Sequence, residues 1–159
     1  MFKSDPAVLR LCVKLHEDLV KAMSQSVGVN NFTTQMFFQP VAKFFGDIGK
    51  EKGGNMLGLD SLNSNAILFV VGAGLTTEEP ALAIAHERLG RMVAQIKQYA
   101  ASIGADLPFL YLNYADESQN ALGSYPKENV QHMRDMAAKY DPDAVFQKRI
   151  PGGFKISRV

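Results

Sequence analysis

The segment that most constrains the fold is Ala66–Gly72, which is apolar at almost every position. A short run of this kind, rich in β-branched and aromatic residues, is typical of a strand. The lack of polar alternation indicates a central strand covered on both faces. The run is also far too short to span a bilayer. The sequence therefore predicts a sheet built around this segment.

Two long segments have helical spacing. The first begins near residues 4–6, where Ser4 and Asp5 offer a capping oxygen and Pro6 suits a first turn, and it ends at Gly28. Its apolar stripe consists of Val8, Leu11, Cys12, Leu15, Leu19, Ala22 and Met23. The second opens at residues 77–80 with a Thr77 cap and the acids Glu78 and Glu79, and it ends at Gly104. Its stripe consists of Leu82, Ala85, Leu89, Met92, Val93, Ile96, Tyr99, Ala100 and Ile103.

The remaining elements are shorter. Phe32–Gln39 is expected as a strand that Pro40 stops, and Phe109–Tyr114 as a third strand. A short helix is expected over Val41–Lys52, and a last helix over residues 124–140. The side chains expected to point inward from these helices are Val41, Phe44, Phe45, Ile48, Val130, Met133, Ala137 and Tyr140.

These elements define a fold class. Strand, long helix and strand in succession make a crossover unit, so the second and third strands should run parallel. The first two strands should run antiparallel. We expect an α+β fold with a small mixed or antiparallel sheet, helices packed on one face, and a single domain over residues 1–159.

Strand alternation points to a candidate site on the other face of the sheet. Side chains of a strand point alternately to its two faces. If Leu110 and Leu112 face the helices, then Phe109, Tyr111 and Asn113 face away. The same reasoning places Gln35, Phe37, Gln39, Phe69 and Val71 on that face. The result would be a pocket floored by Phe37, Phe69 and Tyr111 with Gln35, Gln39 and Asn113 as polar points, which is the usual character of a small-molecule site. The same aromatics could instead form core or a dimer interface.

The last third of the chain carries a family resemblance. Its blocks are Tyr111-x-Asn113-Tyr114-x-Asp116, Ser124-Tyr125 with Asn129, Tyr140-Asp141-Pro142, Val145-Phe146 and residues 151–155. Together they resemble the C-terminal segment of the berberine-bridge-enzyme-like FAD-linked oxidases, and the ending resembles fungal members. The resemblance implies half of an oxidase substrate domain whose sheet roofs a cavity above the flavin. It also implies that Tyr111 meets the reacting substrate, with Asn113 and Tyr114 beside it. Pro126 departs from the usual glycine of the family.

Flavin binding by this chain is not expected. The resemblance covers nearly the whole chain, and none of it matches the N-terminal flavin domain of the family. Residues 70–77 mimic a dinucleotide fingerprint, but Thr77 occupies the third glycine position, and Glu78 and Glu79 would repel pyrophosphate. The three histidines lie on different predicted helices, so no metal site is expected either.

Three functions are compatible with these observations. The leading one is a flavin-independent enzyme of natural-product metabolism that catalyses cyclisation, cycloaddition or isomerisation, with Tyr111, Gln39 and Asn113 as catalytic residues. Its substrate-binding residues would be Gln35, Phe37, Phe69 and Tyr114. A free tyrosine has a pKa near 10, so a tyrosine acting as a base near neutrality would need a lowered pKa, whereas a tyrosine that donates to a carbonyl would not. The alternatives are a C-terminal fragment or subunit of an FAD-linked oxidoreductase and a non-catalytic binding or dimerisation module.

Composition bears on partners and location. A net charge of +1 favours neither nucleic acid nor an anionic membrane. Cys12 is the single cysteine, and the N-terminus lacks the apolar core of a signal peptide, so cytoplasm is expected. The partners expected are a small organic substrate and a second copy of the chain, because three strands would leave an open edge and an uncovered apolar face. Residues 145–159 could instead fold back over that face.

Overall fold

The computed structural model describes residues 1–77 and 79–159. The chain divides into two compact units, each built from separate stretches of sequence. The sheet unit consists of Phe2–Pro40 and Ala66–Leu107, and the tail unit consists of Met1, Val41–Asn65 and Pro108–Val159. The expectation of one domain over residues 1–159 stays a prediction, since compact units of this size can belong to a single domain.

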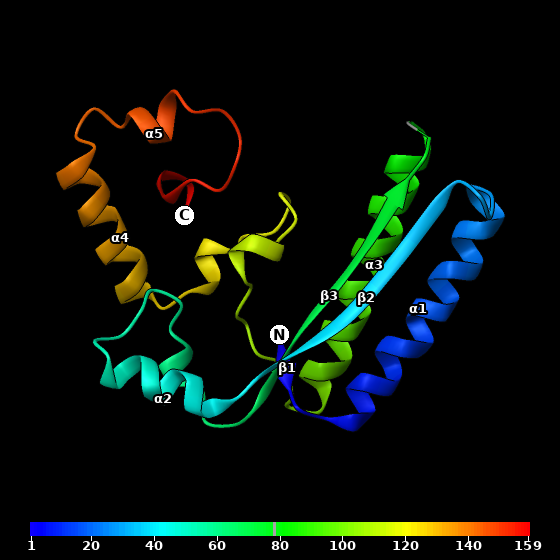
Figure 1. Cartoon of the computed structure of the whole chain (residues 1–159), viewed down its shortest axis with the longest axis horizontal. Helices are drawn as coiled ribbons and strands as arrows, with labels where there is room; N and C mark the ends of the chain where they lie inside the picture. The colour runs from blue at the N-terminus through cyan, green and yellow to red at the C-terminus, as the bar shows by residue number, and fades with distance from the viewer. Residues whose placement is uncertain (78) are drawn as a thin grey trace. The chain divides into compact units, whose positions relative to one another are not determined.

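The sheet has three strands in the order β1-β3-β2: β1 (Phe2–Lys3), β3 (Ala66–Leu75) and β2 (Phe32–Val41) (Figure 1). β1 pairs antiparallel with β3 through Phe2 opposite Ile67 and Lys3 opposite Ala66. β2 and β3 also run in opposite directions. The predicted α+β class, the antiparallel first pair and the central place of the apolar segment are therefore confirmed.

The predicted third strand is wrong. Residues 109–111 are irregular, and Leu112–Tyr114 forms a 3₁₀ turn in which Tyr114 N donates to Tyr111 O at 2.9 Å. The place beside β3 is taken by β1, and Lys3 N donates to Ala105 O at 2.8 Å. With that edge of β3 occupied by β1, Phe109–Tyr114 does not pair with β3. The parallel pair and the crossover unit are therefore wrong as well.

Pro40 does not stop β2, which continues to Val41. Thr76 N donates to Asn31 O at 3.0 Å, so the backbone of Asn31 faces β3. Backbone groups of a strand point alternately to its two sides. Even-numbered residues of β2, Pro40 included, therefore direct their backbone away from β3. The missing N–H of Pro40 costs no ladder hydrogen bond, which is the circumstance in which a strand tolerates proline.

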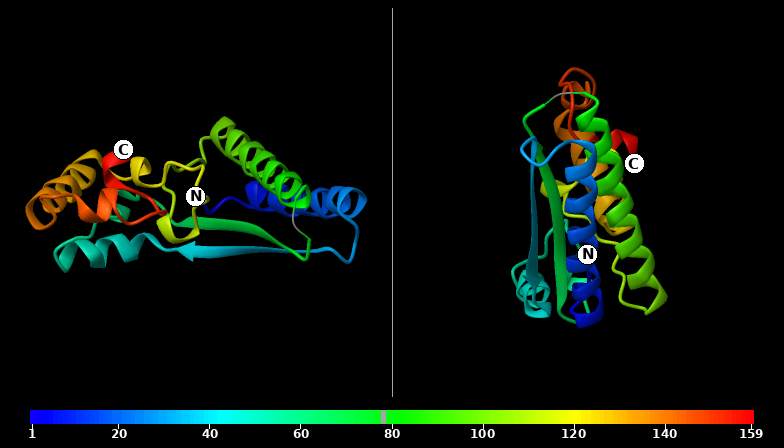
Figure 2. Two further views of the ribbon diagram at one scale, coloured as in Figure 1. Left: turned by 90° about the horizontal axis from the view of Figure 1, so that it is seen from above. Right: turned by 90° about the vertical axis from the view of Figure 1, so that its right-hand side faces the viewer.

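Two helices, α1 (Pro6–Ser26) and α3 (Ala81–Ser102), lie side by side over one face of the sheet (Figure 2). The predicted start of α1 is confirmed, since Asp5 Oδ1 accepts hydrogen bonds from Ala7 N at 2.7 Å and Val8 N at 3.2 Å. The predicted Thr77 cap of α3 is wrong, because Pro80 is the N-cap and, among the residues described, no side-chain hydrogen bond caps this end. The role expected for Glu78 lies outside the described residues.

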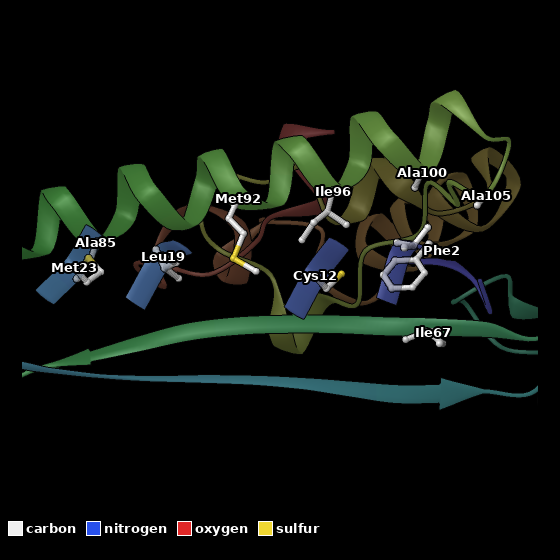
Figure 3. Packing of buried hydrophobic residues seen from close by; sticks show 11 residues of the cluster. Phe2, Cys12, Leu19, Met23, Ile67, Ala85, Met92, Ile96, Ala100 and Ala105 are labelled. Carbon is white, nitrogen blue, oxygen red and sulfur yellow. The ribbon is translucent and has the colours of Figure 1, made fainter. Parts of the chain in front are cut away.

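The core of the sheet unit fills the space between these two helices and β3 (Figure 3). α1 contributes Val8, Cys12, Leu19 and Met23, α3 contributes Ala85, Met92, Ile96 and Ala100, and the sheet contributes Phe2 and Ile67. Burial raises the pKa of the Cys12 thiol to about 12. Cys12 is therefore a protonated core residue. The predicted stripe of α3 is wrong at Leu82, Tyr99 and Ile103, whose side chains are exposed.

The tail unit is built from α2 (Lys43–Glu51), α4 (Lys127–Tyr140), α5 (Val145–Lys148) and short 3₁₀ turns. The inward face predicted for α2 is wrong: Phe44, Phe45 and Ile48 are about half exposed. The contact is made instead by Gly46, which is buried against the backbone of Leu59. No side chain would fit there, so the large apolar residues of α2 face away.

The end of α4 at Asp141 is confirmed, and Val130 is buried as expected, whereas Tyr140 is exposed. Asn129 Nδ2 connects α4 to the segment after α2 by donating to Asn55 O at 3.3 Å and Met56 O at 3.1 Å. The Asp141 carboxylate then accepts from Val145 N at 2.7 Å and Phe146 N at 3.0 Å, which caps α5.

Candidate functional site

A group of polar and aromatic side chains forms around the 3₁₀ turn Leu112–Tyr114 of the tail unit. Asn113 Nδ2 donates a hydrogen bond of 3.0 Å to the hydroxyl oxygen of Tyr111. The rings of Tyr111 and Tyr114 meet edge to face, with centroids 5.0 Å apart and planes at 87°. This turn therefore brings Tyr114 beside Tyr111 and Asn113, whereas a strand would have pointed Tyr114 to the opposite face.

Tyr125 and Phe109 support this group from below the surface. Both rings are buried, and they stack with centroids 5.5 Å apart and planes at 13°. The stack is held by Ser124, whose Oγ accepts from Leu110 N at 2.9 Å and donates to Ala121 O at 2.6 Å. The irregular segment 108–111 is therefore anchored although it belongs to no sheet.

The hydroxyl of Tyr125 is buried and makes no hydrogen bond of standard geometry within the described part of the chain. Burial raises the pKa of Tyr125, the nearby Tyr111 raises it further, and the Leu112 backbone partly offsets both. Tyr125 therefore stays a neutral phenol beside Tyr111. Sequence reasoning missed this neighbour, because Tyr125 is remote from Tyr111 in sequence and only the Ser124-Tyr125 block drew attention to it.

Three more predicted site residues lie on β2 in the sheet unit. Gln35, Phe37 and Gln39 are exposed, whereas Met36 and Phe38 between them pack toward the helices. The predicted alternation along this strand is confirmed. The candidate residues thus form two groups, Tyr111, Asn113 and Tyr114 in the tail unit and Gln35, Phe37 and Gln39 in the sheet unit.

The predicted face of Phe69 is wrong. Its ring lies 5.6 Å from that of Phe38 and 6.5 Å from that of Phe2, among side chains packed against the core. Opposite residues of neighbouring strands share a face, so Phe69 joins Phe38 rather than Phe37. Val71 packs against the core as well. Neither residue floors a pocket with Phe37.

The residues described do not fit the pyrophosphate of FAD. Gly72 and Gly74 lie inside β3, which runs on to Leu75, and not in a turn that opens a helix. The helix that follows begins at Ala81, with Glu79 two residues before it. Such binding needs backbone N–H groups at a helix start and no acid beside them. Across residues 1–77 and 79–159, no group of three or more His, Cys, Asp or Glu side chains could hold a metal ion.

A hollow of about 420 Å³ lies between α1 and α3. Its lining consists of Leu11, Leu15, Gln95, Gln98, Tyr99 and Ser102. None of the predicted site residues lines this hollow. Among the residues described, no helix is both long and apolar enough to cross a membrane.

No protein-family model and no solved structure matches the chain. Curated fungal proteins do match it over nearly its full length. It is 35% identical to the FAD-dependent monooxygenase drtC of Aspergillus calidoustus, over 99% of this chain and 30% of that protein. It is 28% identical to the FAD-dependent monooxygenase sdcF of Emericella nidulans, over 99% of this chain and 33% of that protein.

The bifunctional solanapyrone synthase of Alternaria solani is 30% identical over 74% of this chain and 22% of that protein. The chain thus spans about a third or less of the length of these relatives. It is similar to fungal proteins named as FAD-dependent enzymes, which is consistent with a relation to FAD-linked oxidases. The narrower resemblance to the berberine-bridge-enzyme-like group stays a prediction.

Proposed function

We propose that this chain is the substrate-contacting part of an FAD-dependent oxidoreductase of fungal natural-product metabolism. The observation that carries the proposal is the similarity over 99% of the chain to proteins named FAD-dependent monooxygenases, of which it spans about a third. The poor fit of residues 70–77 to a pyrophosphate group supports the same proposal. In this proposal the chain contacts the substrate, and the flavin is held elsewhere.

The Tyr111 group provides the chemistry on this chain. Because Asn113 donates to the Tyr111 oxygen, the hydroxyl hydrogen of Tyr111 is available for a substrate carbonyl or alkoxide oxygen. The edge-on ring of Tyr114 restricts the orientation of the Tyr111 ring. A preorganised donor of this kind stabilises negative charge that develops on oxygen in a transition state. Gln39, Gln35 and Phe37 are proposed as further contacts along the substrate.

The purified chain should be colourless and should not take up FAD stoichiometrically, because its glycine-containing segment lies inside β3 and not in a turn that opens a helix. The measurement is absorbance in the flavin bands after incubation with FAD and removal of free cofactor. Purified drtC, treated in the same way, provides the positive control. A yellow chain with one bound FAD would contradict the proposal that the flavin is held elsewhere.

Tyr111→Phe should slow turnover roughly a hundredfold, the typical cost of losing one preorganised donor. The assay uses a chimera in which this chain replaces the matching third of drtC, with the natural substrate of drtC. Flavin content should not change. The matched control is Tyr140→Phe, since Tyr140 is also in the tail unit and is exposed. Equal turnover in both variants would show that Tyr111 is not a catalytic residue.

A flavin-independent enzyme is the second candidate, and it would carry out cyclisation, cycloaddition or isomerisation with the same residues. A relative named bifunctional synthase favours it, since that name assigns more than one activity to one protein. Conversion by the chain alone, without FAD, would establish this candidate over the first. If neither the chain nor the chimera converts substrate, a non-catalytic binding or dimerisation module is the remaining reading.

A further inference from the structure

β2 is a long edge strand with little protection. It runs for 10 residues, Phe32–Val41, and β3 is its one neighbour in the sheet that the described residues form. Natural edge strands are commonly protected by charged side chains, prolines, bulges or short length. No residue of β2 is charged, and its single proline is next to last. This strand therefore offers an edge suited to pairing with another strand.

The backbone groups that line this edge follow from the pairing with β3. Asn31 O accepts from Thr76 N, so the odd-numbered residues face β3. The amides and carbonyls of Phe32, Thr34, Met36 and Phe38 then point outward. Within residues 1–77 and 79–159, no hydrogen bond from a loop or side chain reaches these outward amides. They form a regular row of donors and acceptors.

We propose that two copies of this chain pair antiparallel through the open edge of β2, with Gln35 at the twofold axis. Phe32 then lies opposite Phe38 of the second copy, and Thr34 lies opposite Met36 of the second copy. This register uses every outward amide and carbonyl of the row. A shift by one pair would put Pro40, which has no N–H, opposite Phe32. The uncharged strand meets itself without repulsion, and a closed twofold dimer needs no other surface.

The dimer also enlarges the outward face of the sheet. Twofold pairing within one sheet plane keeps the helices of both copies on the same side. Gln35 meets Gln35 of the second copy, and Phe37 lies opposite Thr33 of the second copy. The outward residues Gln35, Phe37 and Gln39 of both copies then share one continuous surface, so each copy contributes contacts to the candidate face of the other.

Light scattering at micromolar concentration tests the proposal. The wild-type chain should have twice the monomer mass of 17.5 kDa. Gln35→Lys and Gln35→Glu each place like charges face to face at the axis, and each should return the mass to 17.5 kDa. Mixing the two variants should restore the doubled mass. Thr33→Lys is the matched control, because it adds the same charge on the same face opposite Phe37, and it should remain dimeric.

Hydrogen exchange gives a second measurement that needs no substitution. The amides of Thr34 and Met36 should exchange more slowly as the wild-type concentration rises, whereas those of Gln35 and Phe37, which face β3, should not respond. A wild-type mass of 17.5 kDa on concentrating the sample would overturn the proposal. So would a Gln35→Lys chain that stays dimeric, since the dimer would then use another surface. If β2 pairs instead with a strand of a flavin-bearing part, the chain on its own should stay monomeric, which is the first of these two results.

Discussion

Replacing Gly46 by alanine is expected to lower the free energy of unfolding of the tail unit by about 2 kcal/mol or more. This value is the difference between two opposing effects. A Cβ at this position would collide with the backbone of Leu59 and Asp60, which cannot rotate away as a side chain can. Overpacking of this kind costs about 3 kcal/mol. Alanine in a helix returns only about 1 kcal/mol of propensity relative to glycine. The collision therefore dominates.

Urea denaturation followed by tyrosine fluorescence measures this effect, because the chain has no tryptophan and four of its five tyrosines lie in the tail unit. Gly90→Ala is the control. Gly90 lies within α3, and a methyl group there would meet nothing within 4 Å. That change should stabilise α3 by about 0.5–1 kcal/mol. A Gly46→Ala chain with an unchanged or higher midpoint would show that α2 does not pack through Gly46.

Met92→Ala is expected to cost the sheet unit about 3 kcal/mol. Met92 is 3% exposed and points from α3 into the space between Leu19 and Cys12 of α1 (Figure 3). Truncation removes buried apolar surface and leaves a cavity that the two helices and the sheet can close only in part. The loss should appear as a lower thermal midpoint in circular dichroism.

The control for Met92→Ala is Leu82→Ala on the same helix. Leu82 is 57% exposed, so its truncation should change the free energy of unfolding by less than about 0.5 kcal/mol. If the two variants melt together, α3 would not be packed through the face that carries Met92. The interpretation of its buried stripe would then be wrong.

Much of the sheet unit follows from local sequence. The cap at Asp5 and the stripe of α1 depend on neighbours within a turn or two, and they are found as expected. The alternation of β2 likewise placed Gln35, Phe37 and Gln39 on the outward face, because polar and apolar residues differ along that strand. In the tail unit, the stop of α4 at Asp141 before Pro142 is equally local.

Other features depended on which segments become neighbours. β3 is apolar throughout, so it carries no alternation, and only its pairing with β2 turned Phe69 toward Phe38. α2 has a clear apolar stripe, yet it packs against the backbone of Leu59 through Gly46, and Phe44 is left exposed.

The segment 109–114 has the composition of a strand, but the two-residue β1 already occupied the edge of β3. Tyr111 consequently lies in a turn beside Asn113 and near Tyr125, a residue that no local pattern relates to it. Periodicity along the chain determined the two long helices, the strands β2 and β3, and which side of β2 carries Gln35 and Gln39. Register, edge occupancy and backbone contact are properties of pairs of distant segments, and only the tertiary structure decided them.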